Sequence, residues 1–197
     1  PQQTLHGLTF NQDMSQGPFY IDGCDTTPKL FRKRCEAYGD RTAMREKTFG
    51  IWRSHSWADY YTRAKHIGLG LVSLGLKTGE VVSILSEDNK EWMYTDMGVQ
   101  GVGAICSGVY TTDSASQLEY LVNNSDSRFL IVENDEQLDK FLAVREAMPG
   151  LLKVIVIERD GLHGFEDPQI LFMDELYALG EAYADKHPGA FEATIEA

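Results

Sequence analysis

The chain has 197 residues, of which 43% are hydrophobic and 24% are charged, and its net charge is −12. This composition is typical of a globular protein and excludes a fibrous or disordered one, and no apolar run approaches the roughly 20 residues of a membrane span. Residues 133–197 carry 15 acidic and 5 basic side chains, and this negative charge argues against a nucleic acid partner.

The three cysteines, Cys24, Cys35 and Cys106, form no CxxC pair, and the five histidines form no HxxxH pair that would indicate a metal site. Cys106 lies in an apolar run and is interpreted as a small buried residue. The N-terminal residues show no basic start followed by an apolar block, so we expect no secretory signal. These features favour a reducing, cytoplasmic setting, and we expect no metal-binding residue.

The N-terminal third of the chain shows three short elements after an expected extension at residues 1–27. A helix is predicted at residues 28–38, because it would place Pro28 in the first turn, where proline is common. Two strand-like stretches flank Phe49-Gly50 and predict a β-hairpin with strands at residues 42–47 and 51–56.

A long amphipathic helix is predicted after the hairpin. From Trp57 to Leu74, apolar residues recur at spacings of three and four, which is the period of a helix with one buried face. Ser56 is expected to cap this helix, with Asp59 as the acidic partner of a capping box. Gly75 is expected to end it.

The rest of the chain alternates apolar runs with helical stretches. Strands are predicted at residues 81–85, 103–110, 129–132 and 154–157, and helices at residues 89–100, 114–122, 136–148 and 173–186. Asp113 is expected to cap the second of these helices, residues 161–169 to form a loop, and residues 188–197 to form a linker without a closing element. The pattern predicts an α/β subdomain at residues 28–187, with a doubly wound, mostly parallel sheet that helices cover on both faces.

Gly101-Val-Gly103 raises the question of a phosphate-binding loop. A dinucleotide fingerprint places G-x-G-x-x-G between a strand and the helix that follows it, so that helix amides point at the pyrophosphate. Here the glycines leave a predicted helix and enter a predicted strand, and position 106 is cysteine. We therefore interpret them as helix termination with close helix–sheet packing.

Carboxylates precede two of the predicted helices. Acidic side chains near a helix N-terminus are favoured by the helix dipole, so we interpret Glu87, Asp88 and Glu91 as capping residues rather than catalytic ones. A second acidic group lacks the spacing of a calcium-binding EF-hand and is interpreted as a solvated helix start. Its members are Glu133, Asp135, Glu136 and Asp139.

Open α/β sheets bind ligands outside the carboxyl ends of their strands. The loops at residues 86–89 and 110–113 follow two predicted strands, so they are the crevice candidates. The candidate crevice-lining residues are Ser86, Glu87, Asn89, Tyr110, Thr111 and Thr112. The sequence contains neither a G-x-S-x-G elbow nor a G-x-x-x-x-G-K-[ST] loop, so residue chemistry alone predicts an α/β domain without a complete active site.

Several short motifs follow one another in a characteristic order. They are WADY at residues 57–60, GLKTGEVV at 75–82, SEDNKEW at 86–92, GA at 103–104, VYTT at 109–112 and SASQLEY at 114–120. This series resembles the N-terminal region of adenylate-forming (AMP-binding) acyl-CoA synthetases, and residues 136–158 resemble their long-chain fatty acid–CoA ligase branch. One departure is Ser-Glu-Asp-Asn, where many members of the family have Ser-Glu-Asn.

The resemblance implies a two-step activity for the full-length protein. A fatty acid reacts with ATP and Mg²⁺ to give acyl-AMP and pyrophosphate, and coenzyme A then displaces AMP. The phosphate-binding loop of the family, which is rich in Ser, Thr and Gly and ends in Lys, is not found in these 197 residues. We expect this loop to lie beyond the linker and the chain alone to be inactive, and we assign it no catalytic or cofactor-binding residue.

Two alternatives stay open. The first is an enzyme of the same superfamily with an aryl or medium-chain acid as its substrate. The second is a non-catalytic α/β module that binds a partner through its acidic C-terminal third. Peripheral membrane contact and homodimer formation also stay open for the whole enzyme.

Overall fold

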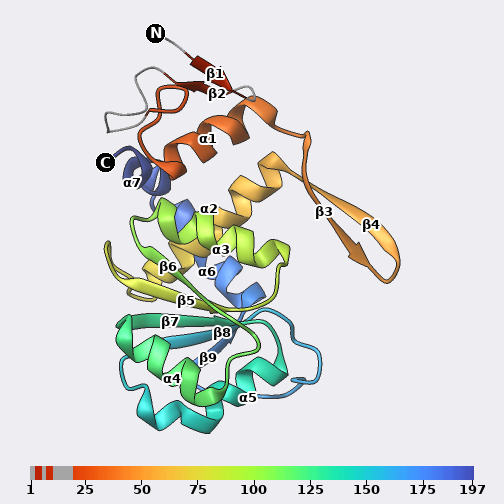
Figure 1. Cartoon of the computed structure of the whole chain (residues 1–197), viewed down its shortest axis with the longest axis vertical. Coiled ribbons are helices and arrows are strands. Elements are labelled where there is room, and N and C mark those ends of the chain that lie inside the picture. Colours follow the sequence, from red (N-terminus) through yellow and green to blue (C-terminus); the bar gives the residue numbers. More distant parts are fainter. Residues whose placement is uncertain (1–2, 6–7, 11–19) are drawn as a thin grey trace.

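The computed structural model describes residues 3–5, 8–10 and 20–197. Its N-terminal part contains two antiparallel strand pairs and two helices (Figure 1). They are β1 (Gln3–Leu5) with β2 (Leu8–Phe10), α1 (Thr27–Tyr38), β3 (Thr42–Thr48) with β4 (Ile51–Ser56), and α2 (Trp57–Ser73). The predicted short helix, hairpin and long helix are confirmed, whereas most of the predicted 1–27 extension lies outside the described residues.

A five-stranded parallel sheet forms the centre of the remaining chain. Its strands are β5 (Val81–Leu85), β6 (Ile105–Val109), β7 (Ser127–Val132), β8 (Lys153–Val156) and β9 (Ile170–Phe172), in the order β6-β5-β7-β8-β9. The helices are α3 (Lys90–Gly101), α4 (Ala115–Asn124), α5 (Asp135–Val144) with the short turn η1 (Arg145–Ala147), and α6 (Met173–Lys186). The predicted α/β fold is confirmed, and β9 adds a strand too short to show a period in the sequence.

The sheet separates two apolar cores, because successive residues of a strand point to opposite faces. Along β7, Phe129 and Ile131 join a core built with α1, α2, α3, α6 and α7 (Ala190–Glu196), whereas Leu130 and Val132 join a second core with α4 and α5. Figure 1 shows the sheet between these two helix layers. Helical cover on both faces explains why the central strands read as continuous apolar runs.

Helix α2 approaches its neighbours α3 and α6 very closely. A methyl group added at Gly98 of α3 would lie 2.4 Å from the carbonyl oxygen of Ala64. One added at Gly180 of α6 would lie 1.8 Å from the carbonyl oxygen of His66. Because no larger side chain fits at these distances, the two glycines set how near the three helices pack.

The helix starts confirm one capping prediction and correct another. Ser56 Oγ accepts the Asp59 N–H at 3.0 Å and Asp59 Oδ2 accepts the Ser56 N–H at 3.1 Å, which is the predicted capping box of α2. Helix α4 is capped by Ser114 rather than Asp113. Ser114 Oγ accepts the Gln117 N–H at 3.3 Å, and Gln117 Oε1 accepts the Ser114 N–H at 2.8 Å. A glutamine three residues on completes the box only from position 114.

The C-terminal segment is a helix, not the linker without a closing element that the sequence predicts. Phe191 of α7 is fully buried, and a methyl group added at Gly101 would lie 2.4 Å from its ring. Gly101 therefore makes room for α7, which corrects the predicted helix–sheet packing to helix–helix packing. Gly103 ends α3 with a φ of 75°, so the predicted helix termination is confirmed.

Candidate functional site

The carboxyl ends of β5 and β6 lie side by side at one edge of the sheet, because the two strands are parallel neighbours. Residues 86–89 leave β5 there and residues 110–113 leave β6, and a hollow of about 410 Å³ lies between them. Its lining residues are Ser86, Glu87, Asp88, Trp92, Gly108, Val109, Tyr110 and Thr111. Four of the six predicted residues share this hollow, while Asn89 and Thr112 lie outside its lining.

Glu87 joins the two loops to the end of β7. Its side chain accepts a hydrogen bond from the Thr111 hydroxyl. Its backbone N–H donates to Glu133 Oε2 at 2.7 Å, and the Ser86 hydroxyl lies 3.5 Å from the same oxygen. Glu133 is half-buried, so its predicted place in a solvated helix start is wrong. The contact exists because β7 lies next to β5, a strand order that the sequence pattern does not contain.

Asn89 has a structural part at the start of α3. Its Oδ1 accepts the N–H of Trp92 at 2.8 Å, and its Nδ2 donates to Ser86 Oγ at 2.8 Å. Asn89 is thus the N-cap of α3. The prediction that Glu87 caps this helix is wrong. Glu91 does lie in the first turn of α3, where the helix dipole favours an acid.

Thr112 lines a neighbouring hollow of about 490 Å³ over the start of α5. In this hollow Lys140 Nζ donates to the carbonyl oxygen of Thr111. Gln137 is 4% exposed, and its buried Oε1 has no hydrogen-bond partner among the described residues. Sequence reasoning missed both side chains, because their position depends on how α5 docks. Their spacing of three residues, which puts them on one helix face, was the available signal.

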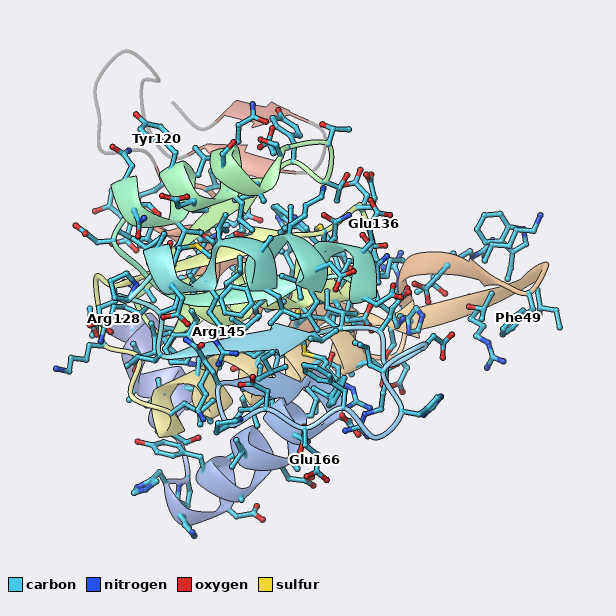
Figure 2. The ribbon with its side chains drawn as sticks, turned by 90° about the horizontal axis from the view of Figure 1, so that it is seen from below. Phe49, Tyr120, Arg128, Glu136, Arg145 and Glu166 are labelled. Carbon is cyan, nitrogen blue, oxygen red and sulfur yellow. The ribbon has the colours of Figure 1, made fainter. Side chains whose placement is uncertain are left out.

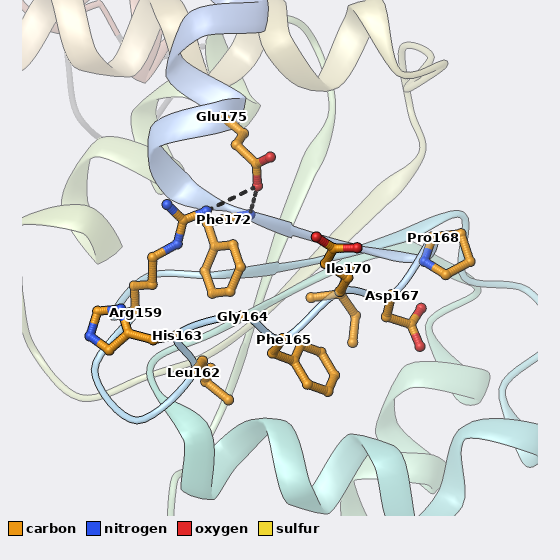
Figure 3. A pocket seen from close by; sticks show the side chains of 11 residues that line it. Arg159, Leu162, His163, Gly164, Phe165, Asp167, Pro168, Ile170, Phe172 and Glu175 are labelled. Carbon is orange, nitrogen blue, oxygen red and sulfur yellow. Dashed lines mark hydrogen bonds and ion pairs between the residues drawn. The ribbon is translucent and has the colours of Figure 1, made fainter.

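A hollow of about 780 Å³ lies beside the loop that joins β8 to β9 (Figure 3). The Arg159 guanidinium lies 4.0 Å from the centre of the Phe172 ring. It also lies 3.3 Å from Asp174 and 3.7 Å from Glu175. The positive charge of Arg159 is therefore paired within the chain, and it is not free to bind a ligand. No sequence motif indicates a function for this loop.

The carboxyl edge of the sheet is rich in carboxylates. Glu87, Glu133 and Glu136 line the two smaller hollows beside Lys140. Burial raises the pKa of Glu158, and the charge of nearby Glu133 raises it further. In the described part of the chain, no three His, Cys, Asp or Glu side chains are placed to hold a metal ion. The negative charge at this edge does not favour a phosphate ligand.

Two cysteines are shielded from solvent. Burial raises the pKa of both Cys35 and Cys106 to about 12. Cys106 is partly rather than fully buried, which modifies the predicted burial. Both thiols stay protonated at neutral pH and are therefore weak nucleophiles.

Comparison with known proteins places the chain in a family. The model of the family described as AMP-binding enzyme matches residues 31–174. Long-chain-fatty-acid–CoA ligase ACSBG1 of Bos taurus is 32% identical over 161 residues, which cover 80% of this chain and 22% of the bovine protein. Long-chain-fatty-acid–CoA ligase ACSBG2 of Xenopus laevis is 32% identical over 160 residues, which cover 81% and 21%. The chain thus spans about a fifth of the length of these curated relatives.

Solved structures share the fold. The anthranilate CoA ligase AuaEII in complex with anthranoyl-AMP superposes with a TM-score of 0.67 at 23% identity, covering 77% of this chain and 27% of that one. Coronafacic acid ligase from Pectobacterium brasiliense superposes with a TM-score of 0.68 at 21% identity, covering 77% and 29%. These structures share the fold, and the match over residues 31–174 shows that the chain belongs to the AMP-binding enzyme family, as its motif order predicts.

Proposed function

We propose that this chain forms the N-terminal part of a long-chain fatty acid–CoA ligase. The observation that carries the proposal is the 32% identity to two proteins of that name over 80% and 81% of the chain. In the whole enzyme, a fatty acid carboxylate attacks the α-phosphorus of ATP, and acyl-AMP and pyrophosphate form. The thiolate of coenzyme A then attacks the acyl carbon, and AMP leaves.

The described residues do not themselves fit ATP, Mg²⁺ or coenzyme A. Phosphate groups bind to cations and to backbone amides, whereas the carboxyl edge presents Glu87, Glu133 and Glu136. The sequence also has no Ser/Thr/Gly-rich loop ending in Lys. We therefore assign no step of the reaction to a residue of this chain, and we propose that the 197-residue chain alone is inactive.

The crevice between residues 86–89 and 110–113 is proposed as one wall of the substrate cleft. Its place at the carboxyl ends of β5 and β6 supports this, because ligands of open α/β sheets bind there. In the whole enzyme, Thr111→Val is expected to raise the KM for palmitate with little change in kcat, because the loop loses its bond to Glu87. An unchanged KM would contradict the proposal that these loops line the substrate cleft.

The substrate class is tested by acyl-CoA formation from palmitate, octanoate and anthranilate with the whole enzyme. We expect the highest kcat/KM for palmitate, since each buried methylene contributes about 0.8 kcal/mol. A preference for octanoate or anthranilate would favour the alternative ligases, and no product from any acid would favour the non-catalytic module. A cytoplasmic location stays a prediction, which cell fractionation can check, and homodimer formation stays open to light scattering.

A further inference from the structure

Glu133 follows the carboxyl end of β7, and its side chain reaches the loop that leaves the neighbouring strand β5. Its Oε2 accepts the N–H of Glu87 at 2.7 Å, and the Ser86 hydroxyl lies 3.5 Å from the same oxygen. The backbone N–H of Glu133 donates to the carbonyl oxygen of Leu85 at 3.0 Å, so the ladder between the two strands continues to this point. One carboxylate oxygen therefore fixes the start of the loop at residues 86–89.

Lys140 of α5 holds the second loop of the crevice. Its Nζ donates to the carbonyl oxygen of Thr111, and the Thr111 hydroxyl donates to the Glu87 side chain, so Thr111 is held from two sides. Helix α5 comes directly after β7 in the chain, and Glu136 marks its start in Figure 2. One strand and the helix that follows it thus contact both loops of the crevice.

Glu133 carries its charge in surroundings that disfavour it. It is half-buried, and its charge raises the pKa of the Glu158 carboxyl group beyond the effect of burial. Because like charges repel, the stability of the sheet alone would favour an uncharged residue after β7. The side chain makes its hydrogen bond to the neighbouring loop, so its contribution is to the position of that loop.

We propose that Glu133 and Lys140 are positioning residues of the substrate cleft, which hold the loops at residues 86–89 and 110–113 in one arrangement. The inference rests on the proposed ligase function, because it takes these loops as a wall of that cleft. Neither residue has to touch the substrate for this. A displacement of about 1 Å in a cleft wall weakens the fit of a substrate, so loss of either contact should affect substrate binding more than the chemical step.

Amide hydrogen exchange of the 197-residue chain tests the positioning without any need for activity. Glu133→Ala is expected to speed exchange of the Glu87 amide about tenfold or more, because this amide loses its acceptor. Glu133→Gln should keep the rate within about threefold, since one amide oxygen can accept from both donors. Lys140→Met should speed exchange in residues 110–113 and leave residues 86–89 nearly unchanged. Exchange in α2 should stay the same in every variant, which shows that the fold is intact.

Steady-state kinetics of the whole enzyme test the effect on the cleft. Glu133→Ala is expected to raise the KM for palmitate about tenfold and to change kcat by less than about twofold. Glu133→Gln should restore most of the KM, because it keeps the acceptor and removes only the charge. A purely structural loss would lower the amount of active enzyme and leave the KM unchanged. The matched control is Asp139→Ala, which removes an exposed carboxylate of α5 and should change neither constant.

The outcomes separate this inference from the proposed function. The positioning role is overturned if Glu133→Ala leaves exchange of the Glu87 amide unchanged, speeds exchange equally throughout the chain, or leaves the KM for palmitate unchanged. No acyl-CoA from the unchanged whole enzyme would instead overturn the ligase function and the cleft with it. Hydrogen exchange would still decide whether Glu133 holds the loop, because it requires no substrate.

Discussion

Two short segments carry apolar side chains that differ in burial. They are α7 and the end of the β3–β4 hairpin, which we call the hairpin tip and which consists of Phe49, Ile51 and Trp52. Phe191 of α7 is fully buried and Ile195 is 5% exposed, whereas Phe49 of the hairpin tip is 99% exposed. Both phenylalanines look alike in the sequence. The comparison shows that an apolar residue in the sequence gains free energy from burial, but that tertiary structure decides whether another element covers it.

The environment of α7 shows what such a partner provides. A helix of 7 residues is too short to be stable by itself, so packing must hold it. Gly101 leaves room for the Phe191 ring, and the Tyr61 ring meets that ring edge-on at 5.8 Å. Glu192 Oε1 accepts hydrogen bonds from Lys65 at 2.8 Å and from Tyr61 at 3.0 Å. The hairpin tip has no comparable contacts within the described residues.

The largest expected effect is the loss of the buried ring. Phe191→Ala should lower the free energy of unfolding by about 3–5 kcal/mol, because it leaves a cavity beside α3. Phe49→Ala should change it by less than about 0.5 kcal/mol, because it removes no packing. Urea titrations of both variants make the comparison. Equal losses would show that the two rings do not differ in burial.

A second substitution probes the same contact from its other side. Gly101→Ala places a methyl group 2.4 Å from the Phe191 ring and should destabilise the chain by about 1–3 kcal/mol. In the Phe191→Ala background the cost should disappear, since the ring is gone. A double-mutant cycle measures this coupling. Additive losses would mean that Gly101 serves another purpose than admitting α7.

The ion pair of α7 should contribute less and should depend on pH. Burial opposes ionisation of Glu192, but hydrogen bonds from Lys65 and Tyr61 outweigh it and hold the pKa below its usual value of 4.5. Its stabilisation is therefore present above the unfolded-state pKa and is lost as pH falls through the folded-state one. Glu192→Gln should cost about 1 kcal/mol at neutral pH and nothing in strong acid. A cost that does not vary with pH would contradict this account. The control is Glu196→Gln, which removes only an exposed ion pair with Arg32 at 3.3 Å and should cost less than about 0.5 kcal/mol.

The smallest expected effect on stability is at the hairpin tip. Phe49→Asn should leave the free energy of unfolding unchanged or raise it by up to about 0.5 kcal/mol, because Asn tolerates a positive φ. Thermal unfolding of this variant beside the unchanged chain measures the effect. A loss of more than about 1 kcal/mol would show that Phe49 packs within this chain after all.

Local signals predicted most of the fold, because each depends on neighbours in sequence. The period of α2, its capping box from Ser56 and the apolar run of β5 are of this kind. Helix α7 was not predicted, because its two buried residues, Phe191 and Ile195, form only one helical repeat after a Pro-Gly pair. The pairing of β5 with β7 brings Glu133 to Glu87, and no pattern within either strand encodes it.

The candidate crevice divides in the same way. Ligands of open α/β sheets bind at the carboxyl ends of the strands, and this rule predicted the loops that meet there. Four of the predicted residues line one hollow, namely Ser86, Glu87, Tyr110 and Thr111. Lys140 and Gln137 approach the neighbouring hollow only because α5 packs there, so they were not found.

Palmitate-dependent exchange between ATP and labelled pyrophosphate tests the proposed function most directly. We expect exchange from the longest polypeptide that the gene encodes and none from the 197-residue chain, because the phosphate-binding loop is not found in its sequence. Exchange by the 197-residue chain would contradict the proposal that the groups for adenylation lie outside it. No exchange by the longest polypeptide would contradict the assignment as a fatty acid–CoA ligase.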